Sequence, residues 1–196
     1  MKKKKQYKEY DDETLQRIQQ VELEILKDFM DICDRHGLTY FGIAGTGIGA
    51  LRHQGFIPWD DDIDVLMPRP DYDRLLNEVN IDYTDLPEYI KMCSWKKGNL
   101  NYPFIKLIDT RTHIDVDYFD SEMICDHIWI DIFAIDGNPD EERKVEKIYK
   151  KSLDLRKLVF LKLADPHDGK TKIKKMLKPF IVKILSVVKM QNLCKK

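Results

Sequence analysis

The sequence lacks the features that would place the chain in an oxidising compartment or across a membrane. Its four cysteines, Cys33, Cys93, Cys125 and Cys194, are far apart and form no C-x-x-C pair, so reduced thiols are expected. No run approaches the roughly 18 apolar residues of a spanning helix, and no apolar segment of the signal-peptide type follows the lysine-rich start. We therefore expect a cytoplasmic protein in which nothing crosses a membrane unaided.

Acidic residues are missing from the last part of the chain, where residues 170–196 hold nine lysines and no aspartate or glutamate. Since the whole chain carries a formal charge of -1, residues 1–169 carry a charge of -10. An acidic body does not offer the broad basic face that nucleic-acid binding requires, so no nucleic-acid partner is expected. It suits a site that collects divalent cations.

The length allows one domain of ordinary size with an appendage. A chain of 196 residues that is 43% hydrophobic can bury one core but hardly two. We expect a catalytic-size domain over residues 1–165 and a basic amphipathic helical tail over residues 170–196.

Hydrophobic periodicity predicts alternating helices and strands, with glycine and proline as punctuation. Helices are expected over Asp11–His36, Ala50–His53, Asp71–Val79 and Glu141–Leu163. Strands are expected over Leu38–Ala44, within the run from Asp60 to Met67, and over Tyr102–Ile108, His113–Phe119 and Ile128–Phe133. The glycine-rich stretch at residues 45–49 reads as a tight turn after the first strand. The fold class is α/β (α+β), with helices flanking a mixed sheet.

Two aspartates alternate with apolar residues at the start of the second strand. Side chains on a strand alternate faces, so Asp62 and Asp64 point the same way, about 6 to 7 Å apart, while Ile63 and Val65 point into the core. Such a pair can bind one or two Mg²⁺ or Mn²⁺ ions, which accept carboxylate oxygens and keep water and phosphate as other ligands. The plain alternative is an acidic turn whose aspartates cap the backbone or face solvent.

A third carboxylate, Asp131, is the lone charge in the apolar strand at Ile128–Phe133. It would complete the metal site if its strand lies beside that of Asp64, and it would otherwise be an exposed residue at a sheet edge. Asp115 and Asp117 also alternate with apolar residues and remain competing candidates.

The glycine-rich stretch formally fits the dinucleotide fingerprint G-x-G-x-x-A, which would indicate an NAD(P)-binding oxidoreductase. The context is wrong, because Gly55 and Pro58 end the following helix too early for a full crossover. A better interpretation is a helix start whose glycines, beginning at Gly45, let free backbone N–H groups cradle a nucleotide phosphate, with the Thr46 hydroxyl as a further donor. Further phosphate-binding candidates are Arg52, His53 and Lys106, each of which could equally be a solvated surface group.

Three segments together resemble the LicD family, which includes bacterial phosphocholine transferases and relatives of fukutin. They are TYFGIAGTGIGALRHQGFIPWDDDIDVLMPRPDYDRLL, FIKLIDTRT and IWIDIFAIDG, and the resemblance extends over about residues 15–160. It implies a nucleotidyltransferase-type fold. It also assigns Gly45 and Thr46 to the nucleotide-phosphate turn, Asp62 and Asp64 to the metal-binding pair, Asp131 to the third acid and Lys106 to a recurrent lysine.

The reaction that the resemblance implies is transfer of phosphocholine, or a similar phosphoryl-alcohol, from a CDP carrier such as CDP-choline to a glycan hydroxyl. The acceptor would be a cell-surface glycan of the lipopolysaccharide, teichoic acid or capsule type, free or lipid-linked, and the cofactor Mg²⁺ or Mn²⁺. The alternative is a catalytically silent nucleotide- or glycan-binding module of the same fold. Two departures are Gly47, where the family commonly has leucine, and the absence of the further segment with which family members usually continue.

The basic tail combines an apolar stripe with interspersed lysines. One interpretation is a membrane-surface helix that brings the enzyme to lipid-linked glycans at the inner membrane face. The other is an ordinary amphipathic helix that packs on the body. The stripe consists of Ile173, Met176, Leu177, Phe180, Ile181, Ile184, Leu185 and Val188.

Overall fold

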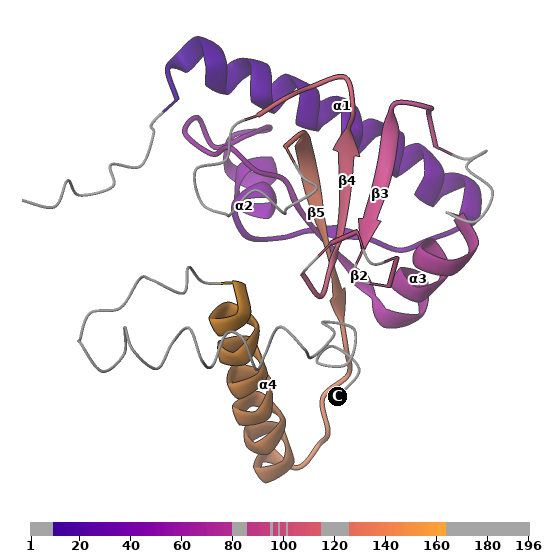
Figure 1. Cartoon of the computed structure of the whole chain (residues 1–196), viewed down its shortest axis with the longest axis vertical. Helices are drawn as coiled ribbons and strands as arrows, with labels where there is room; N and C mark the ends of the chain where they lie inside the picture. The colour runs from indigo at the N-terminus through magenta and orange to yellow at the C-terminus, as the bar shows by residue number, and fades with distance from the viewer. Residues whose placement is uncertain are drawn as a thin grey trace, which may run out of the picture. The chain divides into compact units, whose positions relative to one another are not determined.

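The computed structural model describes residues 10–79, 86–94, 96–97, 99–100, 102–114 and 126–163 (Figure 1). The chain divides into two compact units, which are considered separately. The first unit contains Met1–Met92, Ile105–Ile114 and His127–Ile135, and it holds every residue of the site considered below. The second unit includes the helix α4, Glu142–Leu163, which agrees with the helix predicted there.

The first helix, α1, extends over Asp12–His36, as its apolar spacing predicted. Asp11 caps its start by accepting a hydrogen bond from the backbone N–H of Thr14 at 2.7 Å. Gly37 ends it in the left-handed conformation, with φ of 60°, which glycine adopts at little cost. The buried stripe of α1 includes Ile25, Phe29 and Ile32, and it forms part of the hydrophobic core.

A five-stranded mixed sheet forms the centre of the fold, with the order β1-β2-β5-β4-β3. β1 pairs antiparallel with β2, β2 pairs parallel with β5, and β5 pairs antiparallel with β4. The expected mixed α/β class is therefore confirmed. The strands are β1 Phe41–Gly42, β2 Asp64–Pro68, β3 Ile90–Ser94, β4 Ile105–Asp109 and β5 Ile128–Ile135.

The helices of the first unit pack on this sheet. In Figure 1, α1 runs across the strands, and it contacts β4 and β5. The helix α2, Ala44–Arg52, packs on β1 and β2, and α3, Arg69–Arg74, packs on β2 and β5 before continuing as one π-helical turn, Leu75–Val79. Burial of apolar side chains between α1 and the central strands supplies most of the driving force for this arrangement.

Several predicted boundaries were wrong. The glycine-rich stretch is not a tight turn but lies inside α2, which begins at Ala44 rather than Ala50. β1 is two residues long, β2 begins only at Asp64, and β3 was not predicted. His113 and Ile114 lie outside any strand, and the rest of the strand predicted at His113–Phe119 falls outside the described residues, as does the tail at residues 170–196.

Among the described helices, none is both long enough and apolar enough to cross a membrane.

Candidate functional site

The parallel pairing of β2 with β5 brings two of the predicted acids together. Asp64 and Asp131 are register partners, and the backbone N–H of Asp131 donates to the carbonyl of Ile63 at 2.9 Å. Ile63 and Val65 are buried while Asp64 is half-buried, which is the alternation expected of a strand with one face in the core. The condition set for Asp131, a strand beside that of Asp64, is therefore met. Asp115 and Asp117 lie outside the described residues.

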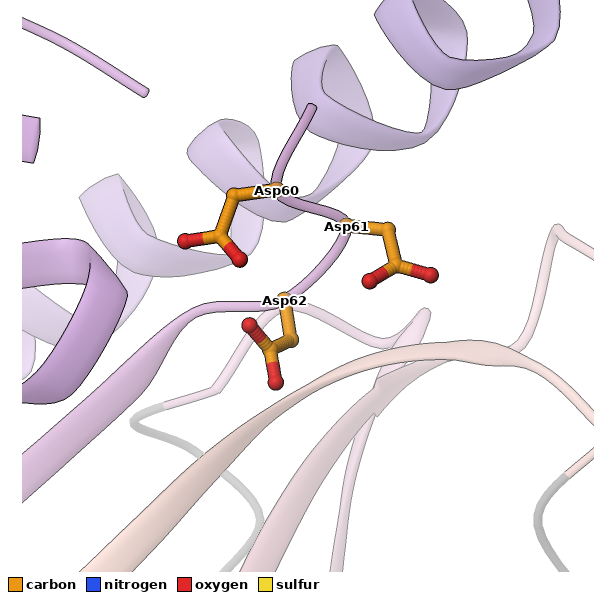
Figure 2. A group of neighbouring side chains, drawn as sticks. All are labelled: Asp60, Asp61 and Asp62. Carbon is orange, nitrogen blue, oxygen red and sulfur yellow. The ribbon is translucent and has the colours of Figure 1, made fainter. Parts of the chain in front are cut away.

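Three consecutive carboxylates, those of Asp60, Asp61 and Asp62, lie on the segment that leads into β2 (Figure 2). Within the described part of the chain, they are the group of three whose oxygens all lie within 4.8 Å of one another. Asp64 and Asp131 are outside that group at this distance. Asp62 was predicted to be a strand residue but lies before β2. Its carboxylate is affected electrostatically both by Asp60 and Asp61 and by Asp64 and Asp131.

The carboxylates of this acidic site perturb one another. Burial, and then the charges of Asp64, Asp60, Asp61 and Asp131, raise the pKa of Asp62 to about 6. Burial and neighbouring acids also raise the pKa of Asp64 and of Asp60. Each ionised aspartate thus makes ionisation of the next one harder. A divalent cation would relieve this repulsion, and the donor set is made of hard carboxylate oxygens, so the residues fit Mg²⁺ or Mn²⁺.

One buried lysine partly offsets the negative charge. Lys106 on β4 is the register partner of Asp131, and its Nζ lies 2.7 Å from Asp131 Oδ1. The same Nζ lies 3.8 Å from the ring centroid of Trp129. Burial raises the pKa of Asp131 despite the opposing effect of Lys106. Lys106, predicted to contact phosphate, is thus paired with a carboxylate of the site.

The start of α2 packs against Asp64 and against the acidic segment, which is the run of Asp60, Asp61 and Asp62. Thr46 Oγ1 accepts a hydrogen bond of 2.9 Å from the backbone N–H of Asp64, and the N–H of Ile43 donates to the carbonyl of Asp64 at 3.1 Å. A Cβ atom at Gly45 would fall 1.9 Å from Asp60 Oδ2, so a larger residue there would displace that carboxylate. Gly45 and Thr46 therefore lie beside the carboxylates, in the first turn of a helix.

Arg52 and His53 are exposed at the other end of α2. Within the described residues, neither side chain forms a hydrogen bond or an ion pair, so the structure does not join them to the acids. The dinucleotide-binding alternative finds no support in this region. α2 has nine residues, and β1 and β2 are antiparallel, whereas a dinucleotide-binding unit needs a crossover helix between parallel strands.

Sequence reasoning missed four residues at this site, and two of them, Asp60 and Asp61, directly precede the predicted pair. Trp129 shares a strand face with Asp131 because the two are separated by one residue, and that spacing could have identified it. Glu22 is an acid within the buried stripe of α1, between Ile18 and Ile25, where an apolar residue is expected. A charge at that position was the available signal.

Comparisons with known proteins agree with this geometry. The family described as LicD/FKTN/FKRP, nucleotidyltransferase domain, matches residues 37–168. The lipopolysaccharide cholinephosphotransferase LicD of Haemophilus influenzae is 37% identical over 140 residues, which cover 70% of this chain and 50% of that protein. An uncharacterized protein of Rickettsia prowazekii is 40% identical over 42 residues, covering 21% of this chain and 16% of that protein.

The chain spans about half the length of the Haemophilus relative and a smaller part of the Rickettsia protein. No solved structure shows a significant match. The family match covers more than half of the chain, and it includes Asp62, Asp64, Lys106 and Asp131. The chain therefore belongs to the LicD/FKTN/FKRP family and carries its nucleotidyltransferase domain.

Proposed function

We propose that the protein is a metal-dependent transferase that moves phosphocholine, or a similar phosphoryl-alcohol, from a CDP-linked donor such as CDP-choline to a hydroxyl of a cell-surface glycan. The observation that carries the proposal is a cluster of carboxylates with too few positive charges beside it. The cluster lies at the start of β2 and at the pairing of β2 with β5, within the residues that match the family domain. The activity for which the Haemophilus relative is named, that of a lipopolysaccharide cholinephosphotransferase, supports phosphocholine as the transferred group and lipopolysaccharide as the acceptor.

The acids of the site have the composition that a catalytic divalent cation requires. Asp62, Asp64 and Asp131 would hold Mg²⁺ or Mn²⁺, with Asp60 and Asp61 adding negative charge next to them. When bound, such an ion stabilises the charge that develops on the phosphoryl oxygens and on the leaving CMP.

The chain's own residues then orient the donor. The first turn of α2 offers backbone N–H groups and the Thr46 hydroxyl to a phosphate, and the bond from Asp64 N–H to Thr46 fixes this turn relative to the acids. Lys106, held between Asp131 and the Trp129 ring, keeps a positive charge at the same place. Arg52 and His53 remain further candidates for a phosphate contact, although they are exposed at the other end of α2.

Turnover with a panel of CDP-alcohols, with and without Mg²⁺, tests the proposal when lipopolysaccharide is supplied as acceptor and CMP release is measured. We expect CMP release that depends on both the acceptor and the metal, with CDP-choline among the substrates. Binding of nucleotide or glycan without turnover would support the catalytically silent module instead. Release of CMP at an equal rate after complete chelation of the metal would contradict metal dependence.

The proposal extends to peripheral membrane contact through residues 170–196. Nine lysines without acids, beside an apolar stripe, favour shallow binding to anionic lipid, with each lysine near the surface contributing on the order of 1 kcal/mol. The full chain and a version ending at Gly169 should be compared by co-sedimentation with anionic and neutral vesicles at two salt concentrations. Only the full chain should pellet, with anionic vesicles and at low salt. Equal behaviour of the two versions would contradict this contact.

A further inference from the structure

Glu22 is a buried acid that neither the sequence pattern nor the predicted metal pair explains. Its side chain projects from the core-facing stripe of α1, and the residue is only 3% exposed. Its Oε2 atom is buried and has no hydrogen-bond partner among the residues that the structure describes. Since buried carboxyl groups are normally paired or hydrogen-bonded, an unpartnered oxygen at this depth indicates a ligand that the protein chain does not itself supply.

The face of α1 that carries Glu22 lies against the acidic segment. Gln19, one turn earlier on the helix, donates from Nε2 to the carbonyl of Asp60 at 2.7 Å. Residues three apart on a helix share a face, so Glu22 is directed toward the same segment. The strongest charge effects on Glu22 come from Asp62 and Asp61, followed by Asp131 and Asp60.

The surroundings of Glu22 are therefore those of the acidic site itself. Burial and these four aspartates raise the pKa of Glu22 to about 10, which is the direction expected for an acid facing other acids without compensating charge. An apolar residue would fill the position with less conflict, as Ile18 and Ile25 do on the same stripe. A divalent cation bound among the aspartates would reverse the conflict, because it favours the ionised form of every carboxylate near it.

We propose that Glu22 supplies a further carboxylate to the divalent-cation site, so that α1 is a functional part of the site although it precedes the residues that match the family domain. This inference rests on the proposed metal dependence. It assigns to Glu22 a role in holding the cation and not in the transfer step.

The test is Mn²⁺ binding to the full chain, measured by titration calorimetry on the parent, on Glu22→Gln and on a matched control, Glu24→Gln. Glu24 lies on the same helix, but its side chain is 48% exposed and lies 3.6 Å from Arg111, away from the consecutive aspartates. We expect Glu22→Gln to raise the Kd for Mn²⁺ by about tenfold or more, the effect typical of losing a supporting carboxylate. Glu24→Gln should change the Kd by less than about threefold, since a single exposed charge contributes little.

Melting temperatures give a second readout that a merely structural glutamate would not produce. Without metal, Glu22→Gln should melt at the same temperature as the parent or above it, because an unpartnered acid has been replaced by a neutral side chain of the same size. The rise in melting temperature on adding Mn²⁺ should be smaller than in the parent. Glu22→Asp, which keeps the charge but is one methylene shorter, should also bind Mn²⁺ more weakly.

The outcomes separate this inference from the proposed function. A parent chain that binds no Mn²⁺ overturns both the metal dependence and the role of Glu22. A parent that binds Mn²⁺ while Glu22→Gln or Glu22→Asp binds it equally well overturns only the role of Glu22. A loss of affinity as large in Glu24→Gln as in Glu22→Gln also overturns it, because the effect would then reflect net charge alone.

Discussion

Asp109 on β4 and Asp131 on β5 are both shielded from solvent in paired strands, yet their surroundings are opposite. The Asp109 side chain is 1% exposed and receives hydrogen bonds from the backbone N–H, Nε and Nη2 of Arg111. Burial alone would raise the pKa of Asp109, but the bonds and charge of Arg111 outweigh it and lower the pKa. At Asp131 burial prevails over Lys106, and the pKa is raised.

The difference distinguishes an acid whose charge is paired within the structure from the acids that we propose to bind a metal ion. Arg111 also lies over the Tyr89 ring at 3.6 Å, and the Tyr89 hydroxyl donates to Asp28 on α1, so the Asp109 region joins β4 to α1 with its charges paired. The acidic site holds Asp60, Asp61, Asp62, Asp64 and Asp131, with Lys106 the cation in direct contact among the described residues. Acids left short of positive charge reduce stability, and a bound cation restores it.

Loss of catalysis should be the largest effect that separates the two regions. Asp64→Ala removes a proposed metal ligand but keeps the backbone N–H that bonds Thr46, so the fold should persist while the rate falls by several orders of magnitude. Metal-dependent CMP release from CDP-choline in the presence of lipopolysaccharide measures this, with circular dichroism as the check of folding. A folded Asp64→Ala protein with the parent's turnover would contradict the assignment.

Removal of Lys106 should take away the positive charge that partly neutralises the carboxylates of the acidic site. Lys106→Met leaves the buried Asp131 without its ion-pair partner, and the free energy of unfolding at pH 7 should fall by about 3 kcal/mol. Urea denaturation with and without Mn²⁺ measures the loss, and Mn²⁺ should recover more of the stability in this variant than in the parent. An unchanged urea midpoint in metal-free buffer would show that the pair has no net stabilising effect.

A change at Asp109, whose charge is paired with Arg111, should lower the stability of the fold without changing metal binding. Asp109→Asn weakens several hydrogen bonds to Arg111, so the free energy of unfolding should fall by about 2 kcal/mol. The affinity for Mn²⁺ should stay that of the parent, because Asp109 does not belong to the acidic site. Parallel urea and calorimetric titrations test both statements, and a large loss of Mn²⁺ affinity in a folded Asp109→Asn protein would break the distinction.

The smallest predicted effect is on the pH dependence of stability without metal. The pKa of Asp62 is raised to about 6, so the folded chain retains a proton that the unfolded chain has already released. The free energy of unfolding should therefore fall as the pH rises from about 4 to about 6, and Asp62→Asn should remove about 1 kcal/mol of that fall, a value reduced for solvent screening.

Asp109 has the opposite sign in the same experiment. Its pKa is lowered, so its stabilisation is present above the ordinary value of 3.8 and is lost as the pH falls through the lowered pKa. Urea denaturation from about pH 2 to pH 7 on the parent, Asp62→Asn and Asp109→Asn resolves the two contributions. A steeper fall between pH 4 and pH 6 in Asp62→Asn than in the parent would contradict the sign given for Asp62.

The sequence by itself determined the bounds of α1 and the residue types that are available to the candidate site. The apolar stripe of α1, with Asp11 before it and Gly37 after it, is information carried by neighbouring residues, and both ends were predicted to within one residue. The alternation of Ile63, Asp64 and Val65 gave the correct faces, although Asp62 lies before the strand, and the same segment carried the family signature. These predictions succeeded because they depend on helical and strand periodicity alone.

Only the tertiary structure decided what depends on contacts between distant segments. The glycine-rich stretch forms a helix in which the missing Cβ atoms leave room for close neighbours. These neighbours are the Asp60 side chain at Gly45, the carbonyl of Gly42 at Gly47 and the carbonyl of Gly55 at Gly49. A glycine in the sequence indicates that another group can approach the backbone closely, but it does not identify that group. β3 was missed because burial of most of its residues gives no alternation to detect.

Strand register brings the residues of the candidate site together. Parallel pairing places Asp64 opposite Asp131, antiparallel pairing places Lys106 opposite Asp131, and the packing of α1 brings Glu22 to the same acids. The residue types and their alternation were visible in the sequence. Their convergence was not, because strand pairing and helix docking are set by burial of the whole core. A shift of one residue in the register of a strand would turn the side chains of that strand to the other face.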